Sequence, residues 1–204
     1  MNEICHEHPR HSAWLSCISM ACGGIRARAR CTRDHMRRRK GMRVLDLGCG
    51  PGYVAEWLAG SEYLGLDTDQ KYINYAQRHY GKYGEFQRNA LSDDFLNGTP
   101  GFDYVLMHGV LHHLSDTEAC EVLRLCHKGL KKGGILLTLD GYYSDDLHAI
   151  ARLLLSLDRG TFVRTKSAYI ALVRTVFPSI KYYEHPDYFR VPYSTLVMEC
   201  QRQN

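Results

Sequence analysis

A chain of 204 residues is long enough to bury one layered core and short for two, so we expect a single domain. With 45% hydrophobic and 24% charged residues, the composition is that of an ordinary globular protein and excludes a disordered or fibrous chain. The net charge of +4 is concentrated in residues 1–40, which hold nine Lys or Arg against three acidic residues. The rest of the chain is slightly acidic and lacks the broad basic face of nucleic-acid-binding proteins.

The amino-terminal segment shows neither a secretion signal nor a metal-binding pattern. The moderately apolar stretch 13–22 follows two glutamates where a signal peptide would be basic, and no apolar run reaches the roughly 18 residues of a membrane span. The eight cysteines include no C-x-x-C pair, which disfavours a zinc site formed by Cys5, His6, His8 and Cys17. We expect reduced thiols, no metal ion and a cytoplasmic location.

Short apolar runs alternate with amphipathic helical patterns in the next part of the chain. Residues 43–47 predict a buried strand that ends in a glycine-rich turn, and a helix follows over residues 53–58. Residues 63–66 predict a second short strand, and apolar side chains at helical spacing predict a helix over 72–80. These elements make two consecutive β-α units.

Three further strands are expected in the middle of the chain, at residues 85–88, 104–107 and 135–139. Before the last of them, Ser115 and Glu118 have the spacing of a capping box, which opens a helix. That helix is expected to end before the turn at Gly133-Gly134. The alternation of strand and helix therefore continues.

Two more helices and two closing strands are predicted towards the carboxyl end. Apolar residues at helical spacing predict helices over 147–155 and 169–177, the second of which ends at Pro178. The closing strands are expected near residues 180–183 and 195–200. Short buried strands that alternate with helices indicate an α/β fold, with a parallel, doubly wound sheet covered on both faces.

The glycine-rich turn after the first strand is a candidate ligand site. Ligands of doubly wound sheets bind beyond the carboxyl ends of the strands, and Gly48, Gly50 and Gly52 allow unusual backbone angles and close approach there. A nicotinamide fingerprint needs a small residue at its sixth position, where this chain has Tyr53. The spacing D-x-G-x-G-x-G that begins at Asp46 instead resembles the first motif of S-adenosylmethionine (SAM)-dependent methyltransferases.

The resemblance to class I SAM-dependent methyltransferases covers most of the chain. Residues 102–114 resemble the fourth motif of the family, and residues 130–134 resemble the turn before its fifth strand. The resemblance implies SAM as cofactor and S-adenosylhomocysteine (SAH) as product. It also implies a Rossmann-like sheet of seven strands, mostly parallel, with an antiparallel C-terminal hairpin.

The resemblance further implies which residues bind the cofactor. Asp67 ends the second strand, where the family has an acid that accepts hydrogen bonds from both ribose hydroxyls. Asn89-Ala90 stands at the adenine-binding position, with Asn in place of the usual Asp, and Thr68 would lie against the adenine. His108 stands where the family contacts the methionine end of the cofactor. The full expected set is Asp46, Gly48, Cys49, Gly50, Gly52, Asp67, Thr68, Asn89, Ala90 and His108.

A narrower resemblance concerns the organisation of the chain. Residues 72–76, 158–160 and 191–193 resemble a bacterial subgroup of small stand-alone methyltransferases. It implies one domain over residues 1–204, with a helical lid (1–40), a SAM-binding core (41–140) and substrate-side helices with closing strands (141–204). The lid would contain an arginine-rich helix, and we expect Arg26 and its neighbours to face solvent.

Methyl transfer from a sulfonium needs mainly alignment and exclusion of water. An oxygen acceptor would also benefit from a general base, and His112 and His113 follow the fourth strand, with His112 the first choice. Structural or cofactor-orienting roles for these histidines stay open. Asp140, Tyr142 and Tyr143 are candidates for the acceptor pocket.

The neutral-to-acidic body favours a small-molecule acceptor, such as a sugar or another metabolite. Methylation of RNA or protein is an alternative suggested by the arginine-rich segment, but the chain lacks the N-P-P-Y type of motif that many such enzymes carry. A SAM-binding regulator without catalysis is a third hypothesis. The sequence specifies neither the acceptor nor the oligomeric state.

Overall fold

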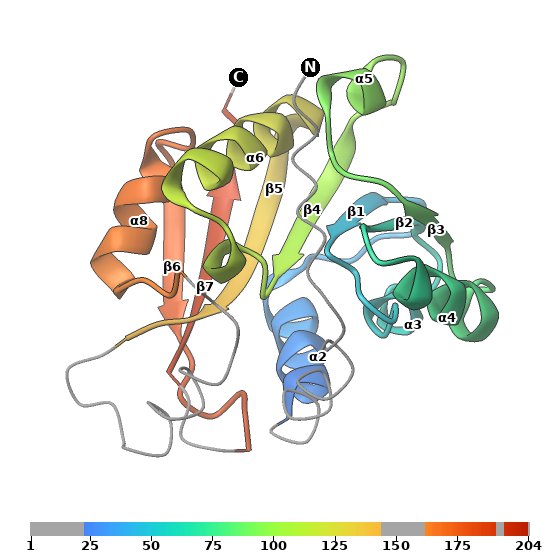
Figure 1. The fold of residues 1–204 in the computed structure, drawn as a ribbon, viewed down its shortest axis with the longest axis horizontal. Helices are drawn as coiled ribbons and strands as arrows, with labels where there is room; N and C mark the ends of the chain where they lie inside the picture. The colour runs from blue at the N-terminus through green and yellow to red at the C-terminus, as the bar shows by residue number, and fades with distance from the viewer. Residues whose placement is uncertain (1–22, 144–161, 191–193, 204) are drawn as a thin grey trace.

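The computed structural model describes residues 23–143, 162–190 and 194–203 (Figure 1). The elements in chain order are α2 (Gly24–His35), β1 (Arg43–Leu47), α3 (Val54–Trp57), β2 (Glu62–Asp67), α4 (Gln70–Tyr80), β3 (Glu85–Arg88), α5 (Asp93–Leu96), β4 (Phe102–His108), η1 (Leu111–His113), α6 (Asp116–Gly129), β5 (Leu130–Gly141), α8 (Lys166–Arg174), β6 (Ile180–Glu184) and β7 (Thr195–Gln201). The helix predicted over 147–155 and the cysteines and histidines of residues 1–22 lie outside the described part.

The seven strands form one sheet in the order β3-β2-β1-β4-β5-β7-β6. Strands β1 to β5 pair in parallel, whereas β7 is antiparallel to both β5 and β6. The expected Rossmann-like sheet with an antiparallel C-terminal hairpin is therefore confirmed. Leu47 is in register with Leu66, and His108 with Leu139, so the chain leaves the central strands at one common edge.

Side chains that alternate along the central strands supply two hydrophobic cores, one on each face of the sheet. Val105 of β4 packs in the core that α6 and α8 cover, and Leu106 packs in the core that α2, α3 and α4 cover. Leu136 and Leu137 of β5 divide in the same way. Figure 1 shows α2 next to the arrowhead of β4, so this helix lies at the carboxyl edge of the sheet.

The boundary between α6 and β5 differs from the prediction. Helix α6 opens with the predicted Ser115–Glu118 capping box and ends at Gly129, but residues 130–134 belong to the strand rather than to a turn. Leu130 pairs with Phe102, and the register shifts before the next pair on β4. Backbone bonds join Gly133 and Gly134 to Arg202, at 3.0 and 2.9 Å. This distant partner keeps the glycines in the strand.

The described residues were compared with the expectations for membrane spans, metal sites and disulfide bonds. No helix in the described ranges is long and apolar enough to cross a membrane. Among the same residues, no three His, Cys, Asp or Glu side chains gather in a way that would hold a metal ion. The five described cysteines, Cys31, Cys49, Cys120, Cys126 and Cys200, are free thiols.

Candidate functional site

The glycine-rich loop is attached to the end of β2 by its own backbone. Gly48, Gly50 and Gly52 have φ angles of 67°, 54° and 83°, in the region that favours glycine. The Gly48 amide donates to the Leu66 carbonyl at 2.8 Å, and the Gly50 amide donates to Oδ2 of Asp67 at 2.9 Å. These backbone bonds hold the shape of the loop, and its three glycines have no side chain that would block a ligand.

Gly52 and Gly50 differ in the space around them, which makes them a matched pair. A Cβ at Gly52 would lie 2.8 Å from both Ala76 Cβ and Phe86 Cε1, whereas no atom of the described residues lies within 4 Å of a Cβ at Gly50. We expect Gly52→Ala to lower the free energy of unfolding by about 2–5 kcal/mol, since left-handed strain and overpacking add. Gly50→Ala has only the strain, about 1–2 kcal/mol. Urea unfolding curves measure both, and equal losses would contradict this packing.

Asp46 and Cys49 lie beneath the loop rather than at its surface. Asp46 is 2% exposed and accepts a hydrogen bond from the Tyr63 hydroxyl at 2.7 Å. Burial raises the pKa of the Asp46 carboxyl to about 6. Burial also raises the pKa of the Cys49 thiol, which therefore stays protonated and packs as a small apolar group. Both residues are therefore part of the buried interior next to the loop.

The Asp67 carboxylate lies between the glycine-rich loop and the start of α4. Its Oδ2 accepts from the Gly50 amide and its Oδ1 from the Asp69 amide, each at 2.9 Å. Burial raises the pKa of Asp67, and the two amide bonds oppose that rise. Each carboxylate oxygen has two lone pairs, so each keeps one for a further donor. That is what two vicinal hydroxyls of a ribose require.

The residues expected at the adenine follow β2 and β3 and are exposed. The Asn89 amide donates to the Asp67 carbonyl at 3.1 Å, which joins the two strand ends. The Ala90 amide, expected to read the adenine ring, donates to Oδ1 of Asn89 at 2.9 Å. Thr68 is exposed, and its carbonyl accepts from Nε of Arg88 at 3.2 Å. Thr68, Asn89 and Ala90 are thus exposed at the ends of neighbouring strands, and their contact with adenine stays a prediction.

His108, the last residue of β4, is 2% exposed, and neither of its ring nitrogens has a hydrogen-bond partner among the described residues. Burial, together with the nearby charges of Arg28 and His35, lowers its pKa to about 3. The imidazole is therefore neutral at physiological pH. Its backbone carbonyl accepts a hydrogen bond from Nη2 of Arg28 at 3.3 Å.

Arg28 of α2 is a site residue that sequence reasoning missed. A Cβ at Gly109 would lie 3.6 Å from Nη2 of Arg28 and 3.5 Å from Cε1 of His112, so both side chains border the same position. Arg28 is half-buried and forms no ion pair with any carboxylate in the described ranges. Its neighbours Ala27 and Cys31 are fully buried, and this small apolar face was the signal that α2 packs inward.

The expectation that the arginines of this helix face solvent is correct for only some of them. Arg26 is exposed. Arg28 points to β4 as described, and Arg30 pairs with Asp187 at 2.7 Å with its guanidinium 4.8 Å from the Tyr188 ring. Packing of α2 against residues far along the chain draws these two side chains inward.

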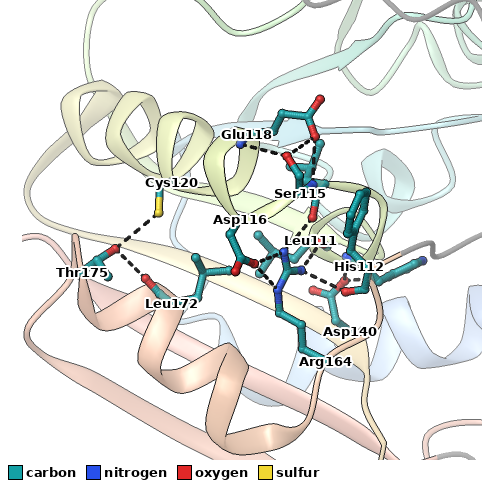
Figure 2. A network of polar contacts seen from close by, with 12 residues as sticks. Leu111, His112, Ser115, Asp116, Glu118, Cys120, Asp140, Arg164, Leu172 and Thr175 are labelled. Atoms are coloured by element: carbon teal, nitrogen blue, oxygen red, sulfur yellow. Dashed lines mark hydrogen bonds and ion pairs between the residues drawn. The ribbon is translucent and has the colours of Figure 1, made fainter.

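His112 forms a buried pair with Asp140, the residue near the end of β5. His112 Nδ1 lies 2.8 Å from Oδ1 of Asp140, and the other carboxylate oxygen has no partner among the described residues (Figure 2). Because a carboxylate accepts hydrogen bonds, this contact favours the tautomer that carries its proton on Nδ1. His113 is exposed, and its ring centroid lies 4.1 Å from that of His112. The two histidines are therefore not equivalent.

The two tyrosines proposed for an acceptor pocket also differ. The Tyr142 hydroxyl donates its hydrogen bond to Oε2 of Glu184 on β6, so its proton already has a partner within the fold. Tyr143 is exposed, and its backbone amide donates to the Arg164 carbonyl at 3.1 Å. Of the pair, Tyr143 has the side chain that is open to solvent.

Comparison with known proteins agrees with this geometry. Residues 45–136 match the family described as "Methyltransferase domain". A ubiquinone biosynthesis O-methyltransferase from Caulobacter vibrioides is 37% identical over 117 residues, which is 54% of this chain and 46% of the relative. The chain thus spans about half the length of the curated relative that it matches.

Solved structures share the fold at low sequence identity. A SAM-dependent methyltransferase from Archaeoglobus fulgidus has a TM-score of 0.70 at 15% identity, over 92% of this chain and 99% of that chain. Human N-acetylserotonin methyltransferase in complex with SAM has a TM-score of 0.65 at 17% identity, over 96% of this chain and 61% of that chain. The strand order and the antiparallel end of the sheet are common to this fold.

Proposed function

We propose that this chain, which carries a class I SAM-dependent methyltransferase domain, transfers the methyl group of SAM to a hydroxyl oxygen of a small-molecule acceptor. The observation that carries the proposal is the His112–Asp140 pair at the same sheet edge as the glycine-rich loop. A base at that edge suits an acceptor that must lose a proton, as a hydroxyl does. The relative from Caulobacter vibrioides, an O-methyltransferase by name, supports an oxygen acceptor.

The residues at the loop fit the parts of SAM. Asp67 has lone pairs for the ribose hydroxyls, and the open position above Gly50 leaves room for the ligand. Arg28 offers a half-buried positive charge for the methionine carboxylate, and the neutral His108 ring is buried beside it. SAM itself supplies a methyl group already activated by a sulfonium. The protein then has to align the acceptor and exclude water.

His112 would act as the general base. Its imidazole would take up the hydroxyl proton of the acceptor as the oxygen receives the methyl group that bound SAM would supply, with SAH as the other product. Asp140 holds the Nδ1 proton and stabilises the imidazolium that results. Both side chains are buried, so bulk water competes little for these bonds.

The arginine-rich segment gives little support to an RNA acceptor. Arg30 pairs with Asp187, Arg38 donates to the Trp57 carbonyl, and Arg39 pairs with Asp103. The two ion pairs offset charges that phosphate binding would need, and the carbonyl contact occupies an N–H of Arg38. A small-molecule acceptor is therefore the better proposal.

Isothermal titration with SAH and an acceptor screen test the proposal together. We expect SAH to bind, and we expect SAH release from SAM with at least one hydroxyl compound from a panel of catechol, phenol and a monosaccharide. Failure to bind SAH would overturn the cofactor assignment. Binding of SAH without turnover of any compound would favour a regulator, and turnover of an amine alone would overturn the oxygen acceptor.

The role of Arg28 can be separated from the rest of the cofactor site. Arg28→Gln should weaken SAH binding by about 10- to 100-fold, the value of a charge-assisted hydrogen bond. Binding of 5′-methylthioadenosine, which lacks the amino-acid carboxylate, should be unchanged. Arg26→Gln, on the exposed side of the same helix, is the control and should leave both affinities unchanged. Equal SAH affinity for Arg28→Gln and the unmodified protein would refute this role.

A further inference from the structure

We propose that Arg164 is a positioning residue for His112, an inference that rests on the proposed function because it concerns the base of that reaction. Arg164 precedes α8 and is only 9% exposed. It lies more than fifty residues along the chain from the turn that carries His112. Figure 2 shows its guanidinium directed at that turn and at the start of α6.

Every N–H of the Arg164 guanidinium has a partner. Nη1 donates to the Leu111 and Phe162 carbonyls at 2.9 and 3.0 Å, and Nη2 donates to the Leu114 carbonyl at 2.7 Å. Nε and Nη2 both donate to Oδ1 of Asp116, at 2.9 and 2.6 Å. A guanidinium has five N–H groups, so none is left for a substrate. The side chain therefore acts on the fold around it.

The carbonyls that Arg164 binds lie at both ends of η1. The last carbonyls of a short helical turn have no partner within the turn, so an outside donor must satisfy them. Arg164 does this for Leu114, and it gives a second donor to the Leu111 carbonyl, which already accepts from the Leu114 amide at 3.2 Å. The His112 carbonyl accepts from the Phe162 amide at 3.1 Å, which attaches the middle of the turn to the same segment.

The segment around Arg164 is in turn attached to the end of β5. The Tyr143 amide donates to the Arg164 carbonyl at 3.1 Å, and Tyr143 pairs with Thr165 in an isolated parallel bridge. Asp140, the partner of the His112 ring, lies in β5, which ends two residues before Tyr143. The backbone of His112 and the carboxylate that orients its ring are thereby held in one frame.

The planar fork of arginine is what this arrangement needs. Lysine has the same charge but a single ammonium, which cannot reach carbonyls at both ends of the turn. Asp116 is largely exposed, so its ion pair with Arg164 is screened by solvent and contributes less than the carbonyl bonds do. Loss of the fork would take one of two donors from the buried Leu111 carbonyl and leave the Leu114 carbonyl without its described donor.

Arg164→Lys is the direct test, with Arg124→Lys as the matched control. Arg124 lies on the exposed side of α6 and forms ion pairs with Asp93 and Glu121, away from η1. We expect Arg164→Lys to lower kcat by about 10- to 100-fold, as misplacement of a catalytic group does, with SAH affinity unchanged. The nuclear magnetic resonance signal of the His112 Nδ1 proton should shift or broaden. Arg124→Lys should change none of these.

Asp116→Asn provides a milder variant in case Arg164→Lys does not fold. It weakens only the exposed contact and should move the His112 signal in the same direction by a smaller amount. An unchanged His112 signal and unchanged kcat in Arg164→Lys would overturn the inference. So would an unchanged signal in Asp116→Asn if Arg164→Lys does not fold. If His112→Gln retains full kcat, the base role fails, while the signal still reports whether Arg164 orients the ring.

Discussion

His112→Gln should lower kcat by about 10²- to 10⁴-fold, the usual contribution of a general base. Glutamine can keep a hydrogen bond to Asp140, but its amide cannot accept a proton as Nε2 of the imidazole does. SAH affinity should stay unchanged, because His112 acts on the acceptor. The measurement is SAH release with the best acceptor of the panel.

His113→Gln is the control for this experiment. His113 is next in the chain and is exposed, whereas His112 is buried beside a carboxylate. We expect a small effect on kcat. A larger loss in His113→Gln than in His112→Gln would show that our proposal names the wrong histidine as the base. Full activity in both variants would show that the acceptor needs no base.

Asp67→Ala should raise the dissociation constant of SAH by about 10²- to 10⁴-fold, which corresponds to two hydrogen bonds to a charged group. The carboxylate has one free lone pair on each oxygen, and it also holds the glycine-rich loop through the Gly50 amide. Its loss would therefore remove contacts with the ribose and loosen the loop. Isothermal titration with SAH measures the effect.

Asp69→Ala is the matched control for Asp67→Ala. The Asp69 side chain caps α4 by accepting from the Lys71 amide at 2.7 Å, and it has no contact with the glycine-rich loop. Loss of this cap should cost about 1 kcal/mol of stability without weakening SAH binding. If Asp67→Ala binds SAH as tightly as the unmodified protein, the assignment of the cofactor site is wrong.

The location of the candidate site follows from the topology. The central parallel strands end at one edge, so Asp67, His108 and the loop after β1 come together although they are far apart in the sequence. Helix α2 lies at that edge and brings Arg28 to it. The fold thus brings polar groups of α2, β2 and β4 to one edge of the sheet.

Most of the fold could be predicted from local patterns. The boundaries of β3 agree with its apolar pattern, and the capping box at Ser115 marks the start of α6. The start of β5 could not be predicted, because Gly133 and Gly134 read as a turn until Arg202 pairs with them. Glycine signals a turn through its own flexibility, whereas strand pairing depends on a partner elsewhere.

The candidate site also has a part that local patterns predict and a part that depends on distant residues. The glycine-rich loop and Asp67 were predictable because short-range spacing and backbone conformation define them within one β-α unit. His112 was predictable only as one of two histidines, since its distinction from His113 comes from Asp140, 28 residues away. The turn that carries it also accepts bonds from Arg164 and Phe162, and no local pattern predicts that contact.

The sequence by itself determined the alternation of strands and helices, the glycine-rich loop and the acid that follows it, because these depend on periodicity and backbone preference over a few residues. Only the tertiary structure decided that Arg28 meets the His108 carbonyl, 80 residues away, and that Arg164 meets Leu111, 53 residues away. An arginine has the same local preferences whether it is solvated or directed inward. Its role is decided by which carbonyls and carboxylates the packing of distant elements brings within hydrogen-bonding reach.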